Sequence, residues 1–171
     1  MASATVAMRP VTPVAQRFGG SPRPVIRVRP FTATDARVLR RWAAAPECFL
    51  HVEDLLASAG VPGTTTSVAV DTDGRVVAVL QCAPEGDVRA GMRSLALLVH
   101  PGRRGAGFGR ASLLAALREP CCASSALLAV VDRENTASLR CFEACGFAAV
   151  GDAAPGRYAE LVCRVPAAAA A

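Results

Sequence analysis

The sequence predicts one α/β domain, of the mixed α+β type, in which strands alternate with helices. Its 171 residues suit a single domain that is large enough to enclose a hydrophobic core. Hydrophobic residues make up 52% of the chain, which favours a packed protein over a disordered one. Segments with the two-residue alternation of strands take turns along the chain with segments of helical spacing. Together these three observations predict the fold class.

The folded domain is expected to span residues 25–166, between two disordered segments. Residues 1–24 carry prolines, glycines and arginines without any acidic residue or sustained periodicity. We expect a disordered extension here, although an arginine-rich and acid-poor segment is also typical of organelle transit peptides. Residues 167–171 are all alanine and predict a disordered tail.

The first half of the domain is expected to hold three strands and two helices. The strands are expected at 25–30, 66–70 and 75–82, and the helices at 32–45 and 46–59. Thr32 and Asp35 have the spacing of a capping box, which marks the start of the first helix. Pro46 suits the first turn of the second helix, and Gly60 suits its end. The Asp-Thr-Asp-Gly turn at 71–74 predicts that the second and third strands form a hairpin.

The second half is expected to add four strands and two helices. The strands are expected at 92–99, 126–131, about 147–150 and 157–165, and the helices at about 109–117 and 135–144. Gly146 follows the last helix, where a glycine permits the left-handed conformation that ends a helix.

A glycine-rich turn loaded with arginine joins the fourth expected strand to the helix after it. Backbone N–H groups at the start of a helix have no partner inside it and lie at the positive end of its dipole. Gly105, Gly107 and Gly109 would let a ligand approach those groups, because glycine has no Cβ. Arg103 and Arg104 add positive charge. This combination predicts a site for a phosphate-bearing cofactor.

Absent residues narrow the choice of phosphate ligand. The chain contains no lysine, and its 19 basic residues are all arginine. A Walker A loop needs a lysine at the phosphates, and a protein Schiff base needs a lysine amine, so both kinds of site are excluded. The glycines from Gly102 to Gly109 are spaced G-x-x-G-x-G-x-G, which does not fit the dinucleotide pattern G-x-G-x-x-G.

Two motifs resemble those of the GNAT (GCN5-related N-acetyltransferase) family. The sequence R-x-x-G-x-G that begins at Arg104 resembles the acetyl-CoA loop of that family, R/Q-x-x-G-x-G/A. The residues from Asn135 to Phe147 resemble its N-x-x-[AS]-x-x-x-Y-x-x-x-G-F segment, and the expected elements follow the family's order. The resemblance covers residues 25–165. It implies a mixed, mostly antiparallel central sheet, flanked by helices, with strands that splay at the acetyl-CoA site.

The resemblance also implies acetyl-CoA as the co-substrate and assigns the residues that contact it. The main chain of the strand before the turn would bind the pantetheine arm and the acyl carbonyl, the turn would wrap the pyrophosphate, and the last helix would flank the cofactor. The residues so assigned are Leu97, Leu98 and Val99 in the strand, Arg103, Arg104, Gly105, Ala106, Gly107, Phe108, Gly109 and Arg110 in the turn and next helix, and Asn135, Ser138 and Phe142 in the last helix.

The sequence indicates the catalytic groups less clearly than the residues that bind the cofactor. Phe142 stands where many family members carry a tyrosine thought to protonate the leaving thiolate, and phenylalanine has no proton to give. A water or Ser138 would then substitute as the general acid. His100 adjoins the turn and titrates near neutral pH, so it is a candidate general base. A chain of water molecules is the alternative base.

Charge and cysteine usage bear on partners and metals. The net charge of +5 comes from the five arginines between Arg9 and Arg29, because residues 35–171 hold 14 arginines and 14 acidic residues. A nucleic-acid-binding domain would carry the excess on its fold, so we expect no nucleic acid partner. The seven cysteines form no C-x-x-C pair. Cys141 and Cys145 have the spacing of one helical turn, but we expect buried, reduced thiols and no metal site.

The expected activity is N-acetylation of a primary amine by direct transfer from acetyl-CoA in a ternary complex. Glu47, Glu53 and Asp54 lie in the region that forms the acceptor site in the family, and could bind a cationic small molecule or peptide. The alternative is a non-catalytic acetyl-CoA-binding regulatory module, in which the missing tyrosine marks lost chemistry. Reduced cysteines and short apolar runs predict a cytoplasmic protein without a membrane segment. We expect it to be a monomer or a homodimer.

Overall fold

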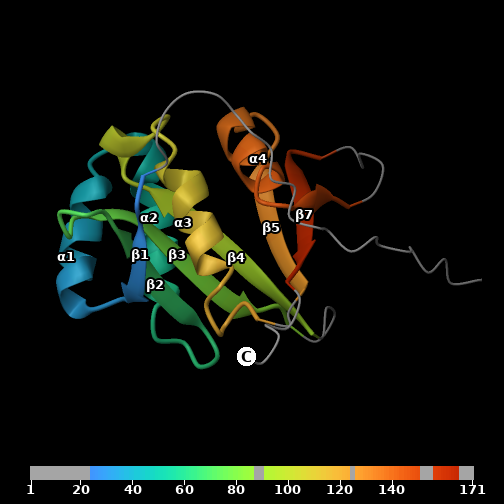
Figure 1. The fold of residues 1–171 in the computed structure, drawn as a ribbon, viewed down its shortest axis with the longest axis horizontal. Helices are drawn as coiled ribbons and strands as arrows, with labels where there is room; N and C mark the ends of the chain where they lie inside the picture. The colour runs from blue at the N-terminus through green and yellow to red at the C-terminus, as the bar shows by residue number, and fades with distance from the viewer. Residues whose placement is uncertain (1–23, 87–90, 124–125, 151–155, 166–171) are drawn as a thin grey trace, which may run out of the picture.

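The computed structural model describes residues 24–86, 91–123, 126–150 and 156–165. In this part of the chain one seven-stranded sheet has the order β1-β2-β3-β4-β5-β7-β6, and helices cover both of its faces (Figure 1). Five of the neighbouring pairs are antiparallel, and only β4–β5 is parallel. The predicted mixed, mostly antiparallel sheet is therefore confirmed. The disordered segments predicted at 1–24 and 167–171 lie outside the described residues, apart from Pro24.

The first elements lie in the predicted order, although the first strand and the second helix begin later than expected. These elements are β1 (Arg27–Pro30), α1 (Ala33–Trp42), a 3₁₀ turn (Pro46–Cys48) and α2 (Phe49–Ser58). The predicted capping box is present, because the backbone N–H and the hydroxyl of Thr32 donate to Asp35 Oδ2 at 2.8 and 2.7 Å. α1 ends at Trp42, before the predicted Ala45, and Pro46 opens the 3₁₀ turn rather than the α-helix itself.

The middle of the chain forms an antiparallel meander of β2 (Thr65–Val70), β3 (Val76–Pro84) and β4 (Met92–Val99). The predicted hairpin turn between β2 and β3 is present. The carboxylate of Asp71 accepts hydrogen bonds from the backbone N–H groups of Asp73 and Arg75. Gly74 completes the turn with φ +76°, a conformation that glycine adopts without a Cβ clash.

The remaining elements are α3 (Phe108–Ala116), β5 (Ala126–Asp132), α4 (Thr136–Glu143), β6 (Ala148–Ala149) and β7 (Tyr158–Arg164). The strand predicted at about 147–150 is reduced to the two residues of β6, which pair with β7 at the edge of the sheet. α4 ends before Gly146, which has φ +96° as a helix-ending glycine should. Within the described ranges, no helix is long and apolar enough to cross a bilayer.

Apolar side chains pack the helices onto opposite faces of the sheet. Leu39 of α1 and Val52 of α2 belong to one buried cluster with Val68 of β2. Ala116 of α3 belongs to another, with Ala69 of β2. Since successive residues of a strand point to opposite faces, the neighbours Val68 and Ala69 place α1 and α2 on one side and α3 on the other. The turn that leads into α3 therefore crosses the end of the sheet.

Candidate active site

β4 and β5 start as a hydrogen-bonded pair and then separate. Their parallel ladder holds three residue pairs, of which the last joins Ser94 to Leu128. Beyond it β4 continues to Val99, paired only with β3 on its other side, and β5 continues to Asp132, paired with β7. The facing edges of the two diverging ends therefore carry backbone groups outside any ladder. The predicted splay of the strands is confirmed.

The glycine-rich turn lies at the open end of this splay. After β4 the chain makes a 3₁₀ turn (Pro101–Arg103) and enters α3 through Gly107, the N-cap residue. Gly105 and Gly107 have φ of +75° and +81°, a region that side chains rarely adopt. The first intrahelical bond runs from the N–H of Ala111 to the carbonyl of Gly107, so the N–H groups before Ala111 point out of the helix start. This is the geometry of an anion site.

Both arginines of the turn contact neighbouring elements. Arg103 pairs with Asp71 of the β2–β3 turn at 3.4 Å and lies over the ring of Phe108. Arg104 pairs with Glu47 at 3.1 Å and donates to Cys48 Sγ at 2.8 Å. Each guanidinium remains partly exposed, at 37% for Arg103 and 41% for Arg104. The positive charge of the turn is thus oriented by side chains that lie far away in the sequence.

Gly109 has a packing role that the sequence did not indicate. A Cβ at this position would lie 3.2 Å from Val99 Cγ2 and 3.5 Å from Cys141 Sγ. The missing side chain therefore lets the first turn of α3 approach both β4 and α4. Gly109 is needed for close packing of these elements, in addition to any approach of a ligand.

The residues predicted on α4 have structural partners of their own. The side chain of Asn135 caps the helix, since its Oδ1 accepts the N–H of Ser138 at 3.0 Å. Ser138 is half-buried. Phe142 is only 4% exposed, and its ring packs edge-to-face on Phe147 with 5.0 Å between centroids. The roles assigned to these residues at the cofactor stay predictions.

His100 lies between the end of β4 and α1. Its Nδ1 accepts a hydrogen bond from the N–H of Gly102 at 3.0 Å, and its ring packs edge-to-face on Trp42. In the neutral ring this contact places the proton on Nε2, so the free lone pair of the imidazole is already engaged. His100 could accept a substrate proton only if the bond to Gly102 broke. Its role as general base stays a prediction, and this contact argues against it.

A cavity beside His100 was not predicted from the sequence. It has a volume of about 520 Å³ and is lined by Arg29, Asp35, Arg41, Trp42 and Arg75, among others. Two of the lining arginines are paired with carboxylates, Arg29 with Asp35 at 2.7 Å and Arg75 with Asp73 at 3.1 Å. The lining comes from β1, α1, the β2–β3 turn and the end of β4, so periodicity along the chain could not have grouped these residues.

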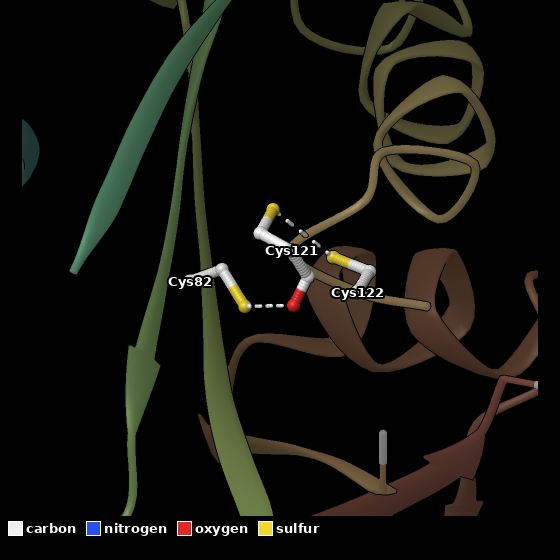
Figure 2. Close-up of side chains that lie close together, drawn as sticks. All are labelled: Cys82, Cys121 and Cys122. Carbon is white, nitrogen blue, oxygen red and sulfur yellow. Dashed lines mark hydrogen bonds between the residues drawn. The ribbon is translucent and has the colours of Figure 1, made fainter. Parts of the chain in front are cut away.

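All seven cysteines lie among the described residues and are free thiols. The sequence drew attention to Cys141 and Cys145, but the structure also brings Cys82 together with Cys121 and Cys122 (Figure 2). A hydrogen bond from Cys122, together with the Arg93 guanidinium, lowers the pKa of Cys82 to about 6. This cluster escaped notice because 39 residues separate Cys82 from Cys121.

With this geometry established, the chain can be compared with known proteins. The sequence profile of the acetyltransferase (GNAT) family matches residues 32–147, which include α1, the splayed strand β4, the glycine-rich turn and α4. The chain belongs to the GNAT acetyltransferase family. The match confirms that the two motifs were correctly assigned to this family. It also confirms the expected class of enzyme, an acyltransferase. A search among curated protein sequences finds no match.

Solved structures show the same GNAT fold. The spermidine N-acetyltransferase from Vibrio cholerae, in complex with CoA and spermine, has a TM-score of 0.64 at 15% identity, over 82% of this chain and 95% of that one. An aminoglycoside acetyltransferase in complex with coenzyme A and kanamycin has a TM-score of 0.64 at 17% identity, over 82% and 95%. Both relatives are bound to CoA, in agreement with the acetyl-CoA co-substrate that the motifs imply.

Proposed function

We propose that this GNAT protein transfers the acetyl group of acetyl-CoA to a primary amine, directly and within a ternary complex. The observation that carries the proposal is the divergence of β4 and β5 at the end of the sheet where the glycine-rich turn enters α3. That arrangement offers backbone donors for a pyrophosphate and, beside them, free strand edges for an extended amide-containing arm. Acetyl-CoA is a ligand that needs both features, because it joins a pyrophosphate to an extended pantetheine arm.

The residues of the turn would bind the phosphates. The N–H groups that follow Gly107 point outward at the positive end of α3, and Arg103 and Arg104 stand beside them with partly exposed guanidinium groups. On binding, Arg104 would exchange some of its contact with Glu47 for a phosphate oxygen. The backbone of Leu97, Leu98 and Val99 would meet the pantetheine arm along the free edge of β4.

Acetyl transfer has three requirements: the amine must lose a proton, the oxyanion must be stabilised, and the thiolate must leave. A primary amine has a pKa near ~10.4, so releasing its proton at neutral pH costs roughly 4 kcal/mol. The oxyanion that forms on the thioester needs a backbone donor, which the free edge of β4 supplies. The thiolate that leaves has a pKa near ~8.5 and departs readily, so the absence of a tyrosine at Phe142 slows the reaction without stopping it. Ser138 or a water supplies the proton.

The amine acceptor is inferred from the exposed carboxylates of the protein and from the substrates for which its solved relatives are named. The two solved relatives are named for spermidine and aminoglycosides, both of which carry several amines. Glu53 and Asp54 are exposed on α2 and could attract such a cation, whereas Glu47 is already paired with Arg104. We therefore place small polyamines and aminoglycosides first among candidate acceptors, and basic peptides second. A cytoplasmic location and a monomeric or homodimeric state stay predictions.

The test has two stages that separate the enzyme from a non-catalytic acetyl-CoA-binding module. Calorimetry first measures acetyl-CoA binding to the full chain. Release of free CoA thiol is then followed against a panel of polyamines, aminoglycosides and peptides. Amine-dependent thiol release supports the transferase, and tight binding without release from any amine supports the module. Release that begins before the amine is added, with an acetylated cysteine, would contradict direct transfer.

A further inference from the structure

Three cysteine side chains converge at the closed end of the splay, away from the glycine-rich turn. Cys82 lies on β3, opposite Leu95 of β4, while Cys121 and Cys122 lie in the connection between α3 and β5 (Figure 2). Their three sulfur atoms are all within 4.8 Å of one another. None of these thiols takes part in the proposed acetyl transfer.

We propose that Cys82, Cys121 and Cys122 together bind one thiophilic metal ion, Zn²⁺ or Cu⁺. Thiolate sulfur is the ligand that both ions prefer. The sequence contains no metal-binding motif that includes these three cysteines. The proposal concerns the stability of the fold. It is independent of the proposed acetyltransferase activity.

The spacing of the sulfurs suits a single ion. A tetrahedral zinc with Zn–S bonds of about 2.3 Å places its thiolates about 3.8 Å apart. Cys121 Sγ and Cys122 Sγ are already 3.8 Å apart. Because Cys82 Sγ lies within 4.8 Å of both, it needs a movement of only about 1 Å to complete the triangle.

The surroundings of the sulfurs also fit an ion. The three cysteines line a cavity of about 10 Å³, whose other walls are the apolar Leu80, Leu95 and Ala116 and the polar Thr65, Ser67 and Glu119. This is space for about one water-sized sphere, which excludes an organic cofactor. Arg93 Nε donates to Cys82 Sγ at 3.1 Å, so a positive charge stands next to the sulfurs. Three thiolates around Zn²⁺ carry one net negative charge, which this guanidinium offsets.

The position of the site assigns the ion a structural role. Cys121 and Cys122 precede β5 by a few residues, and β5 begins at Ala126, the partner of Met92 in the parallel ladder. A metal would tie this connection to β3, directly beside the three residue pairs that hold the two halves of the sheet together. It would add a cross-link beside a ladder of only three residue pairs.

The experiment measures metal binding to the reduced full chain under anaerobic conditions. Zn²⁺ and Cu⁺ are tested separately against a chromogenic chelator, with metal content by mass spectrometry, and Co²⁺ serves as a spectroscopic substitute for zinc. We expect one ion per chain and a sulfur-to-cobalt charge-transfer band. The relative affinities for Zn²⁺ and Cu⁺ then show which of the two ions the three thiols prefer in vitro. Stoichiometric binding of either ion supports the site.

Matched variants locate the binding. Cys121 and Cys141 are both half-buried thiols, so Cys121→Ser and Cys141→Ser remove the same group from similar surroundings. Cys121→Ser should weaken metal binding at least tenfold and abolish the charge-transfer band, and Cys141→Ser should change neither. Circular dichroism checks that both variants fold. Equal loss in both variants would overturn the proposal, and so would a folded wild-type chain that binds neither ion stoichiometrically.

Discussion

Two glycines of one motif are required for different physical reasons. Gly107 has φ +81°, and an added Cβ would lie 3.5 Å from Pro24 Cδ, an ordinary contact distance. Gly109 has no such backbone requirement, but a Cβ there would press on Val99 at 3.2 Å. The first position is therefore limited by backbone conformation and the second by packing. The sequence showed that both glycines matter but could not separate these causes.

Gly107→Val should weaken acetyl-CoA binding at least tenfold. A β-branched residue is strained at a positive φ, by about 1–2 kcal/mol or more, and its side chain covers the N–H groups at the start of α3. Gly60→Val is the matched control, since Gly60 has φ +99° and no atom within 4 Å of an added Cβ. Calorimetry should show normal affinity in the control. Normal affinity in Gly107→Val would remove the turn from the cofactor site.

Arg104→Ala should weaken acetyl-CoA binding by about 1–3 kcal/mol, the range for hydrogen bonds to charged groups. The loss should shrink at high salt, because the guanidinium is 41% exposed. Arg118→Ala removes an exposed arginine just past the other end of α3 and should leave the affinity unchanged. Calorimetry at two salt concentrations measures both variants. Identical effects from the two arginines would indicate general charge attraction only.

Phe142→Tyr tests the missing proton donor. We expect a higher kcat with little change in acetyl-CoA affinity, because the new hydroxyl stands at the position of the family's tyrosine. Phe147→Tyr is the control, since the ring of Phe147 is 3% exposed and packs on that of Phe142. A hydroxyl buried there without a partner should cost about 1–3 kcal/mol of stability and leave kcat unchanged. A loss of stability without any gain in kcat from Phe142→Tyr would contradict this role.

At the scale of elements, the boundaries of the helices were predicted to within about one residue, except at the end of α1 and the start of α2. Thr32 and Asp35 predict the start of α1, because a capping box depends only on residues that are close in the sequence. The end of α1 at Trp42 depends on where α2 packs, which no residue nearby specifies. The shortening of β6 to Ala148–Ala149 has the same origin, because only its pairing with β7 defines the strand.

The ion pair at the start of α1 should make stability depend on pH. Arg29 donates two hydrogen bonds to Asp35, at 2.7 and 2.8 Å, and lowers the pKa of that carboxyl to about 2. A carboxyl with a lowered pKa stabilises the fold above its unfolded value of about 3.9 and loses this contribution as the pH falls towards 2. The contribution is at most about 2 kcal/mol, because water screens the Arg29 side of the pair.

Asp35→Asn should therefore lower the free energy of unfolding by up to about 2 kcal/mol at neutral pH, measured by urea denaturation. The difference from wild type should narrow between about pH 4 and pH 2. Asp73→Asn breaks the pair of Arg75 and Asp73, in which both side chains are more than 60% exposed, and should cost well under 1 kcal/mol. A constant difference for Asp35→Asn across this pH range would rule out the ionic origin.

For the whole molecule, periodicity along the chain predicted most of the strands and helices, and the resemblance of two local motifs to the GNAT family implied the mixed sheet and the splay. The sequence could not predict contacts between distant segments. The pairing of Arg104 with Glu47 spans 57 residues, and the contact between Cys82 and Cys121 spans 39. Such partners depend on how the helices lie on the sheet, which periodicity does not specify.

The splay itself should respond to the co-substrate. If acetyl-CoA lies between β4 and β5, hydrogen exchange should slow at the start of α3 and in residues 95–99 and 129–132. Residues 27–30 and 65–70, in β1 and β2, should be unaffected, because they pair within the other arm of the sheet. Exchange followed by mass spectrometry, with and without acetyl-CoA, measures this. Uniform protection across the sheet would place the ligand elsewhere.

The arginine-only composition of the glycine-rich turn also has a consequence for chemical reactivity. A thioester acylates nucleophilic amines that are held close to it, and the lysine ammonium can lose its proton to become such an amine. The guanidinium groups of Arg103 and Arg104 stay protonated and carry no free lone pair, so they can hold phosphate without attacking the acyl group. With no lysine in the chain, the protein offers its own acyl donor no side-chain amine to consume.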